Sequence, residues 1–191
     1  MRLKFRLTKP ESIKLLLICA LPIHFWAILM VFNEAETLLT ERDLVFALGF
    51  SGYILGVAIL ESVLLFGFVS VLTFLFPKSW QGKTPFLVAL SLGLVTALWA
   101  VGNETFFLLT ETSPPWFEWL RLRMHFRQRM LYPILWLAVI LSAVLPVVTI
   151  PKFERVRAAL DDLVEKLVLL APLYLLFDLV GIGFMIARNL R

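Results

Sequence analysis

Residues 44–76 read LVFALGFSGYILGVAILESVLLFGFVSVLTFLF, and Glu61 is the only charged residue among them. A helix of these 33 residues would measure about 50 Å, whereas the hydrocarbon layer of a membrane is about 30 Å thick. Such an apolar run predicts a membrane-spanning helix, which we place at residues 46–76. Because no turn sequence divides the run, we expect its first residues to lie at the interface or beyond it, or the helix to tilt steeply.

Four further apolar stretches are long enough to cross a membrane, at residues 13–32, 86–109, 131–150 and 167–187. The chain of 191 residues is 60% hydrophobic and 17% charged, with a mean hydropathy of +0.89. Soluble domains are about half apolar and about a quarter charged. We therefore predict an all-α integral membrane protein, a bundle of about five transmembrane helices with interfacial amphipathic segments, that forms one polytopic domain over residues 1–191.

The distribution of Lys and Arg predicts how the chain is oriented. With five spans and a cytoplasmic N-terminus, 11 of the 18 basic residues lie on the cytoplasmic side and 7 on the other. Positive charge favours the cytoplasmic side, so we expect a prokaryotic inner membrane protein with its N-terminus inside and its C-terminus outside. Residues 152–166 (KFERVRAALDDLVEK) repeat apolar residues at helical spacing, which predicts an amphipathic helix on the inner surface.

Three ionisable residues, His24, Glu61 and Asp178, lie near the middle of apolar stretches. Each costs a few kcal/mol in the hydrocarbon layer, so such residues usually have a partner or a function. His24 and Asp178 both lie on helix faces rich in small residues, and we expect them to pair. Tyr174 is one turn from Asp178, to which its hydroxyl group could donate a hydrogen bond.

Glu61 points to the opposite side of its helix from a stripe of small residues, so either Glu61 is protonated or another helix covers it, and we expect that helix to belong to a partner subunit. The glycines that we expect to pack helices closely are Gly49, Gly52, Gly56 and Gly67, with Gly181 on the fifth span. Glu104 is a further acid near the end of the third span.

An arginine-rich segment follows the third span, with Arg121, Arg123, Arg127 and Arg129 alternating with mostly apolar residues. The aromatic residues before it suit the membrane interface. We interpret the arginines as contacts to lipid phosphate; the alternative is a site for an anionic substrate or an acidic partner. Which side of the membrane this segment lies on is left open. Lipids are the ligands that we expect, and the sequence does not identify a cofactor.

The sequence contains no motif of a catalytic or metal site. The single cysteine, Cys19, excludes an internal disulfide and is expected to be a small buried side chain. His24 as the single ligand of a pigment is a further alternative. We expect a non-catalytic subunit or scaffold of a larger membrane protein complex, in contact with the bilayer and other subunits but not with nucleic acid. The alternatives are a small ion- or proton-coupled transporter component that uses His24, Glu61 and Asp178, and an enzyme acting on a phosphate-bearing lipid.

Overall fold

The computed structural model describes residues 7–41, 44–112, 115 and 128–190, in which all regular structure is helical. The helices are α1 (Lys9–Glu41), α2 (Leu44–Leu72), the short 3-10 helix η1 (Thr73–Leu75), α3 (Thr84–Thr112), α5 (Gln128–Lys152), α6 (Glu154–Val168) and α7 (Ala171–Asn189). Five segments are long and apolar enough to cross a membrane, as the sequence predicted. The stretch at 44–76 is continuous through α2 and continues directly into η1.

Local sequence determines where α1 begins. Thr8 precedes the helix, and its backbone N–H donates to Glu11 Oε2 at 2.8 Å, while the Glu11 N–H donates to Thr8 Oγ1 at 3.4 Å. This reciprocal pair is a capping box, which satisfies two backbone donors that the first turn of a helix leaves without partners. Pro10 is also tolerated in this first turn because its missing N–H would have had no partner there.

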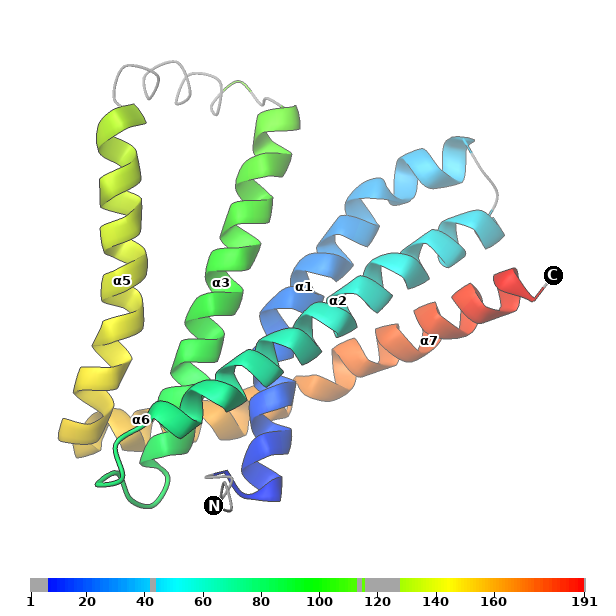
Figure 1. Cartoon of the computed structure of the whole chain (residues 1–191). Coiled ribbons are helices and arrows are strands. Elements are labelled where there is room, and N and C mark those ends of the chain that lie inside the picture. Colours follow the sequence, from blue (N-terminus) through cyan, green and yellow to red (C-terminus); the bar gives the residue numbers. More distant parts are fainter. Residues whose placement is uncertain (1–6, 42–43, 113–114, 116–127, 191) are drawn as a thin grey trace.

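The helices form two groups that share α1 (Figure 1). α2 packs between α1 and α7 in one group, and α3 packs against α1 and α5 in the other. The amphipathic helix predicted at 152–166 is present as α6, which lies across the end of the bundle at which α1 and α3 begin (Figure 1). The largest cluster of buried apolar side chains also lies toward this end, and it includes Leu15, Ile18, Leu87, Leu90 and Val164.

Small residues let pairs of helices approach closely at two places. A Cβ on Gly52 would collide with the backbone of Gly181, so α2 and α7 meet there nearly backbone to backbone. A Cβ on Gly93 would likewise collide with Cys19 Sγ, where α3 crosses α1. Cys19 is fully buried, as expected of a small apolar side chain.

The expected packing glycines have different surroundings. Gly49 is buried beneath the Arg188 side chain. Gly56 and Gly67, in contrast, have nothing within 4 Å of an added Cβ, so neither packs against another helix of the described chain, and the prediction that they pack helices closely is not met within it. The reason is the spacing of the contact row on α2. The row facing α7 advances in steps of three, through Gly49, Gly52 and Leu55, which places Gly56 to one side of it.

Candidate functional site

His24 on α1 and Asp178 on α7 form a buried ion pair. The distance from His24 Nε2 to Asp178 Oδ2 is 3.1 Å, and the two side chains are 2% and 7% exposed. The predicted pairing of these residues is therefore present. The contact is not aligned as a hydrogen bond, and Asp178 Oδ1 has no hydrogen-bond partner among the described residues.

The neighbours of His24 Nδ1 show whether this nitrogen carries a hydrogen. His24 Nδ1 is 2.9 Å from the carbonyl oxygen of Ala20, which can only accept. Nδ1 is also 3.4 Å from Ser62 Oγ, and that hydroxyl donates its own proton to the Ala58 carbonyl oxygen at 2.7 Å. Nδ1 therefore carries a hydrogen.

Tyr174 completes this cluster in a different way from the one expected. Its ring lies on the His24 ring, with a centroid distance of 4.6 Å, and its hydroxyl donates to the Leu17 carbonyl oxygen at 3.0 Å. The prediction that the Tyr174 hydroxyl donates a hydrogen bond to Asp178 is therefore wrong. Side chains on a helix lean toward its N-terminus, so Tyr174 reaches away from Asp178, which lies one turn further toward the C-terminus.

Both nitrogens of His24 face groups of the protein, Nδ1 the Ala20 carbonyl oxygen and Nε2 the Asp178 carboxyl group. No cluster of three metal-ligating side chains occurs in the described part of the chain. His24 and Asp178 thus link α1 to α7 in the interior of the bundle.

Glu61 lies elsewhere, in a groove of about 430 Å³ formed by α1, α2 and α3. The groove is lined by Ile23, Trp26, Ala27, Met30, Ile54, Val57, Ala58, Glu61, Glu104 and Leu108. Glu61 is exposed there, and its carboxyl group is close enough to Glu104 for their charges to repel each other. Trp26 is a side-chain hydrogen-bond partner of Glu104. Two acids from separate candidate spans thus share one apolar groove, a proximity that the sequence did not predict.

The three ionisable residues that stand out in the sequence therefore do not form one site. His24 and Asp178 are enclosed by α1, α2 and α7, whereas Glu61 faces α3. Within the described residues, no recorded hydrogen bond or ion pair joins Glu61 to the His24–Asp178 pair. Arg121, Arg123 and Arg127 lie outside the described residues. Arg129 lies in the first turn of α5, and its side chain is not described.

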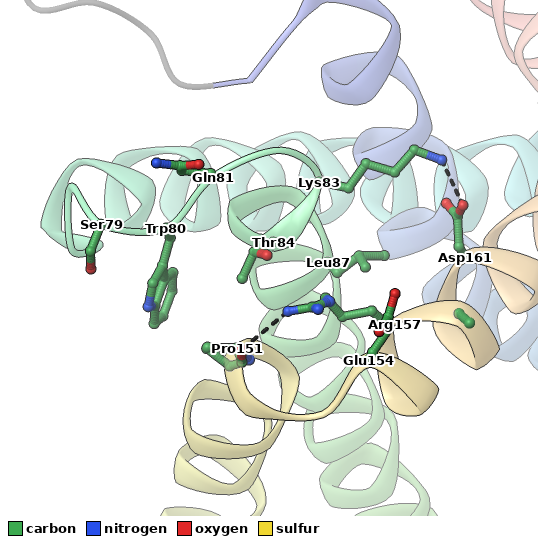
Figure 2. Close-up of a pocket in the computed structure, with 11 residues that line it drawn as sticks. Ser79, Trp80, Gln81, Lys83, Thr84, Leu87, Pro151, Glu154, Arg157 and Asp161 are labelled. Carbon is green, nitrogen blue, oxygen red and sulfur yellow. Dashed lines mark hydrogen bonds and ion pairs between the residues drawn. The ribbon is translucent and has the colours of Figure 1, made fainter.

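A second pocket, of about 550 Å³, lies at the other end of the bundle, between the η1–α3 connection and the α5–α6 junction (Figure 2). Lys83 Nζ is 2.6 Å from Asp161 Oδ2, and Arg157 Nη1 donates to the Pro151 carbonyl oxygen at 3.1 Å. The hydrogen bond to Asp161 raises the pKa of Lys83 above its usual value of 10.5. The sequence indicated the amphipathic helix α6 but not this pocket, because the pocket also needs the connection before α3.

The described side chains thus offer a buried His–Asp pair, an apolar groove with two acids, and a mixed-charge pocket where several helices end. The buried pair has a serine hydroxyl beside it, since Ser62 Oγ lies 3.4 Å from His24 Nδ1, but that hydroxyl donates to the Ala58 carbonyl oxygen at 2.7 Å and not to the imidazole. Comparison of the chain with protein-family models, with curated proteins and with solved structures gave no match.

Proposed function

We propose that this protein is a non-catalytic integral membrane subunit whose groove between α1, α2 and α3 binds a transmembrane helix of a partner protein. The partner helix carries a lysine or an arginine that lies between Glu61 and Glu104. One observation carries the proposal: two acids lie in a groove whose other lining residues are uncharged. A basic residue from outside the chain would be their complement.

The cost of the two carboxyl groups supports this reading. An ionised acid at the centre of a bilayer costs about 2.5–3.5 kcal/mol on insertion scales, and two neighbouring acids also repel each other. A cation between them removes the repulsion and compensates part of that cost. An arginine suits the position best, because its fork of N–H groups can donate to both carboxylates.

The exposure of α5 is a further, weaker argument for a partner. Only 6% of the most apolar window of α5 is buried within the chain, compared with 44% for α3. Lipid or another subunit must cover the remaining surface of α5 if the bundle is in a membrane. We also propose, from the bias of Lys and Arg, that the N-terminus is cytoplasmic, that the C-terminus is outside and that the membrane is a prokaryotic inner membrane.

Neither alternative has comparable support in the geometry. A proton path would need polar groups that connect the His24–Asp178 pair to Glu61, and the described residues record no such contact. The lipid-enzyme alternative depended on the arginine-rich segment, of which only Arg129 lies in the described part of the chain.

Site-specific photo-crosslinking in native membranes tests the proposal. A photoreactive residue at Val57, in the groove, should crosslink to one protein segment, which mass spectrometry should identify as an apolar run with a central lysine or arginine. The matched position is Leu179, which is 73% exposed on α7 and lies outside the groove. We expect Leu179 to give no crosslink to that segment.

Charge variants make the test specific. The double variant Glu61→Gln/Glu104→Gln should lower the Val57 crosslinking yield at least about tenfold, the size expected for the loss of one buried ion pair. Glu165→Gln, an exposed acid on α6, is the control and should leave the yield unchanged. Crosslinks from Val57 to lipid alone, together with a monodisperse monomer after mild extraction, would contradict the proposal.

A further inference from the structure

We propose that the pocket between the η1–α3 connection and the α5–α6 junction binds the headgroup of a zwitterionic phospholipid, one that carries a phosphodiester and a primary ammonium group. Its volume of about 550 Å³ falls in the range of ligand pockets, about 300–1,000 Å³. It lies at the opposite end of α3 from Glu104, so this inference does not depend on the partner helix proposed above.

Arg157 supplies the anion-binding half of the pocket. Its guanidinium group is held in place by the bond from Nη1 to the Pro151 carbonyl oxygen, and Figure 2 shows it reaching across the pocket from α6. A guanidinium group has five N–H donors, and this is the only hydrogen bond recorded for its side chain within the described residues. Arg157 forms no ion pair with an acid among the described residues, and its remaining N–H donors suit a phosphodiester.

Glu154 supplies the cation-binding half. It lies one turn before Arg157 on α6 and lines the same pocket, yet the described residues include no ion pair to its carboxylate. Asp161 is the other acid of the pocket, and Lys83 already neutralises it at 2.6 Å. The pocket therefore presents a guanidinium and a carboxylate one turn apart on α6, neither of them in an ion pair among the described residues, and this arrangement is the charge complement of an amino-phosphate headgroup.

The position of the pocket favours a membrane lipid over a soluble phosphate compound. The pocket lies where the apolar helices α3 and α5 begin and end, the level at which headgroups lie if these helices span a membrane. Trp80 forms one wall, and tryptophan is enriched at membrane interfaces. Phe153, which joins α5 to α6 beside Glu154, is 55% exposed and would meet acyl chains.

Native mass spectrometry of the full chain in detergent, with lipids added, tests the proposal. Phosphatidylethanolamine should be retained at least about fivefold more than phosphatidylglycerol, which lacks the ammonium, or phosphatidylcholine, whose ammonium has no N–H donor. Arg157→Gln should lower the retention of phosphatidylethanolamine by a similar factor. Arg155→Gln, at an exposed position on α6 outside the pocket, is the matched control and should change nothing.

Glu154→Gln gives an independent readout because it changes an exposed residue and should leave folding intact. It should remove the preference for phosphatidylethanolamine over phosphatidylglycerol while both lipids still bind. O-phosphoethanolamine and inorganic phosphate, added at millimolar concentration, should not displace the lipid; displacement by either would overturn the assignment to a lipid. Equal retention of the three lipids by the unchanged protein, or equal losses in Arg157→Gln and Arg155→Gln, would overturn the site itself.

Discussion

At the scale of single residues, the His24–Asp178 pair is the contact most sensitive to substitution, because each side chain is buried and depends on the other. Either single change, His24→Phe or Asp178→Leu, leaves a buried polar group without its partner. We expect each to lower the free energy of unfolding in detergent by about 1–3 kcal/mol. The double variant should lower the free energy of unfolding by less than the sum of the two single changes, because it removes both polar groups together.

A double-mutant cycle measured by unfolding in mixed detergent micelles checks this coupling. Ser12→Ala on α1, combined with Asp178→Leu, is a suitable control, since Ser12 lies three turns from His24 and should act independently of Asp178. Additive costs for His24→Phe and Asp178→Leu would mean that the 3.1 Å contact contributes nothing to stability.

Lys83 gives a prediction for pH dependence. Its pKa is raised in the folded chain by the hydrogen bond to Asp161, so its contribution to stability is fully present below the unfolded value of about 10.5 and is lost as the pH rises through the folded value. Between about pH 9 and about pH 11.5, which lie on either side of that value, the unfolding temperature of the unchanged protein should therefore fall more than that of Lys83→Gln. Because Lys83 is exposed, the difference should be small.

Lys78→Gln is the control for this comparison. Lys78 lies on the same connection between η1 and α3 and has no ion pair within the described part of the chain. The Lys78→Gln variant should follow the unchanged protein at every pH. If Lys83→Gln also follows it, the contact between Lys83 and Asp161 does not hold α6 against α3 in solution.

At the scale of the elements, the contact of α2 with α7 gives a prediction with a built-in comparison. Gly52→Ala and Gly181→Ala each place a methyl group against backbone or a neighbouring side chain, and overpacking of this kind costs about 1–3 kcal/mol. Gly56→Ala and Gly67→Ala add a methyl group where nothing lies within 4 Å. These two should be neutral or stabilise α2 by up to about 1 kcal/mol, because alanine is the better helix former.

The unfolding midpoints of the four alanine variants, measured in one detergent, test whether Gly52→Ala and Gly181→Ala lower stability while Gly56→Ala and Gly67→Ala do not. A loss of stability in Gly56→Ala equal to that in Gly52→Ala would indicate that α7 crosses α2 along a row in steps of four. If Gly56→Ala instead loses stability in native membranes but not in detergent, a neighbouring subunit packs on Gly56.

The elements themselves could be predicted well from sequence, because apolar length depends only on neighbouring residues. The five candidate spans, the unbroken α2 and the amphipathic α6 all follow from that local pattern. The choice between Gly56 and Leu55 as the contact with α7 could not be predicted, since a row in steps of three and a row in steps of four both contain Gly52. That choice depends on the crossing of two helices more than a hundred residues apart.

The residues of the candidate site could likewise be recognised from the sequence, whereas several of their contacts could not be predicted. His24 and Asp178 could be paired from sequence because each lay on a face of small residues, which marks the interior of a bundle. The direction of the Tyr174 hydroxyl was missed because the Leu17 carbonyl oxygen belongs to another helix. Glu61 and Glu104 were each recognised as acids in apolar stretches, but their shared groove depends on where α3 lies relative to α1 and α2.

At the scale of the whole molecule, an odd number of crossings places the two termini on opposite sides of a membrane, and this can be measured. A variant with Cys19→Ala provides a background without thiols, since Cys19 is the only cysteine. Asn33→Cys, in α1 near its end, and Ser79→Cys, between η1 and α3, lie at opposite ends of the bundle and are exposed. In intact cells, a membrane-impermeant maleimide should label Asn33→Cys and should leave Ser79→Cys unlabelled until the cells are opened.

The physical reason for this expectation is the distribution of charge. The end of the bundle that holds α6 also carries Lys9 and Lys14 at the start of α1 and the lysines between η1 and α3, and basic segments are retained on the cytoplasmic side. Leu173→Cys, exposed on α7 within an apolar helix, is the control and should react slowly in both conditions, because lipid would shield it. Labelling of Ser79→Cys but not Asn33→Cys in intact cells would reverse the orientation, and with it place the mixed-charge pocket in the outer leaflet.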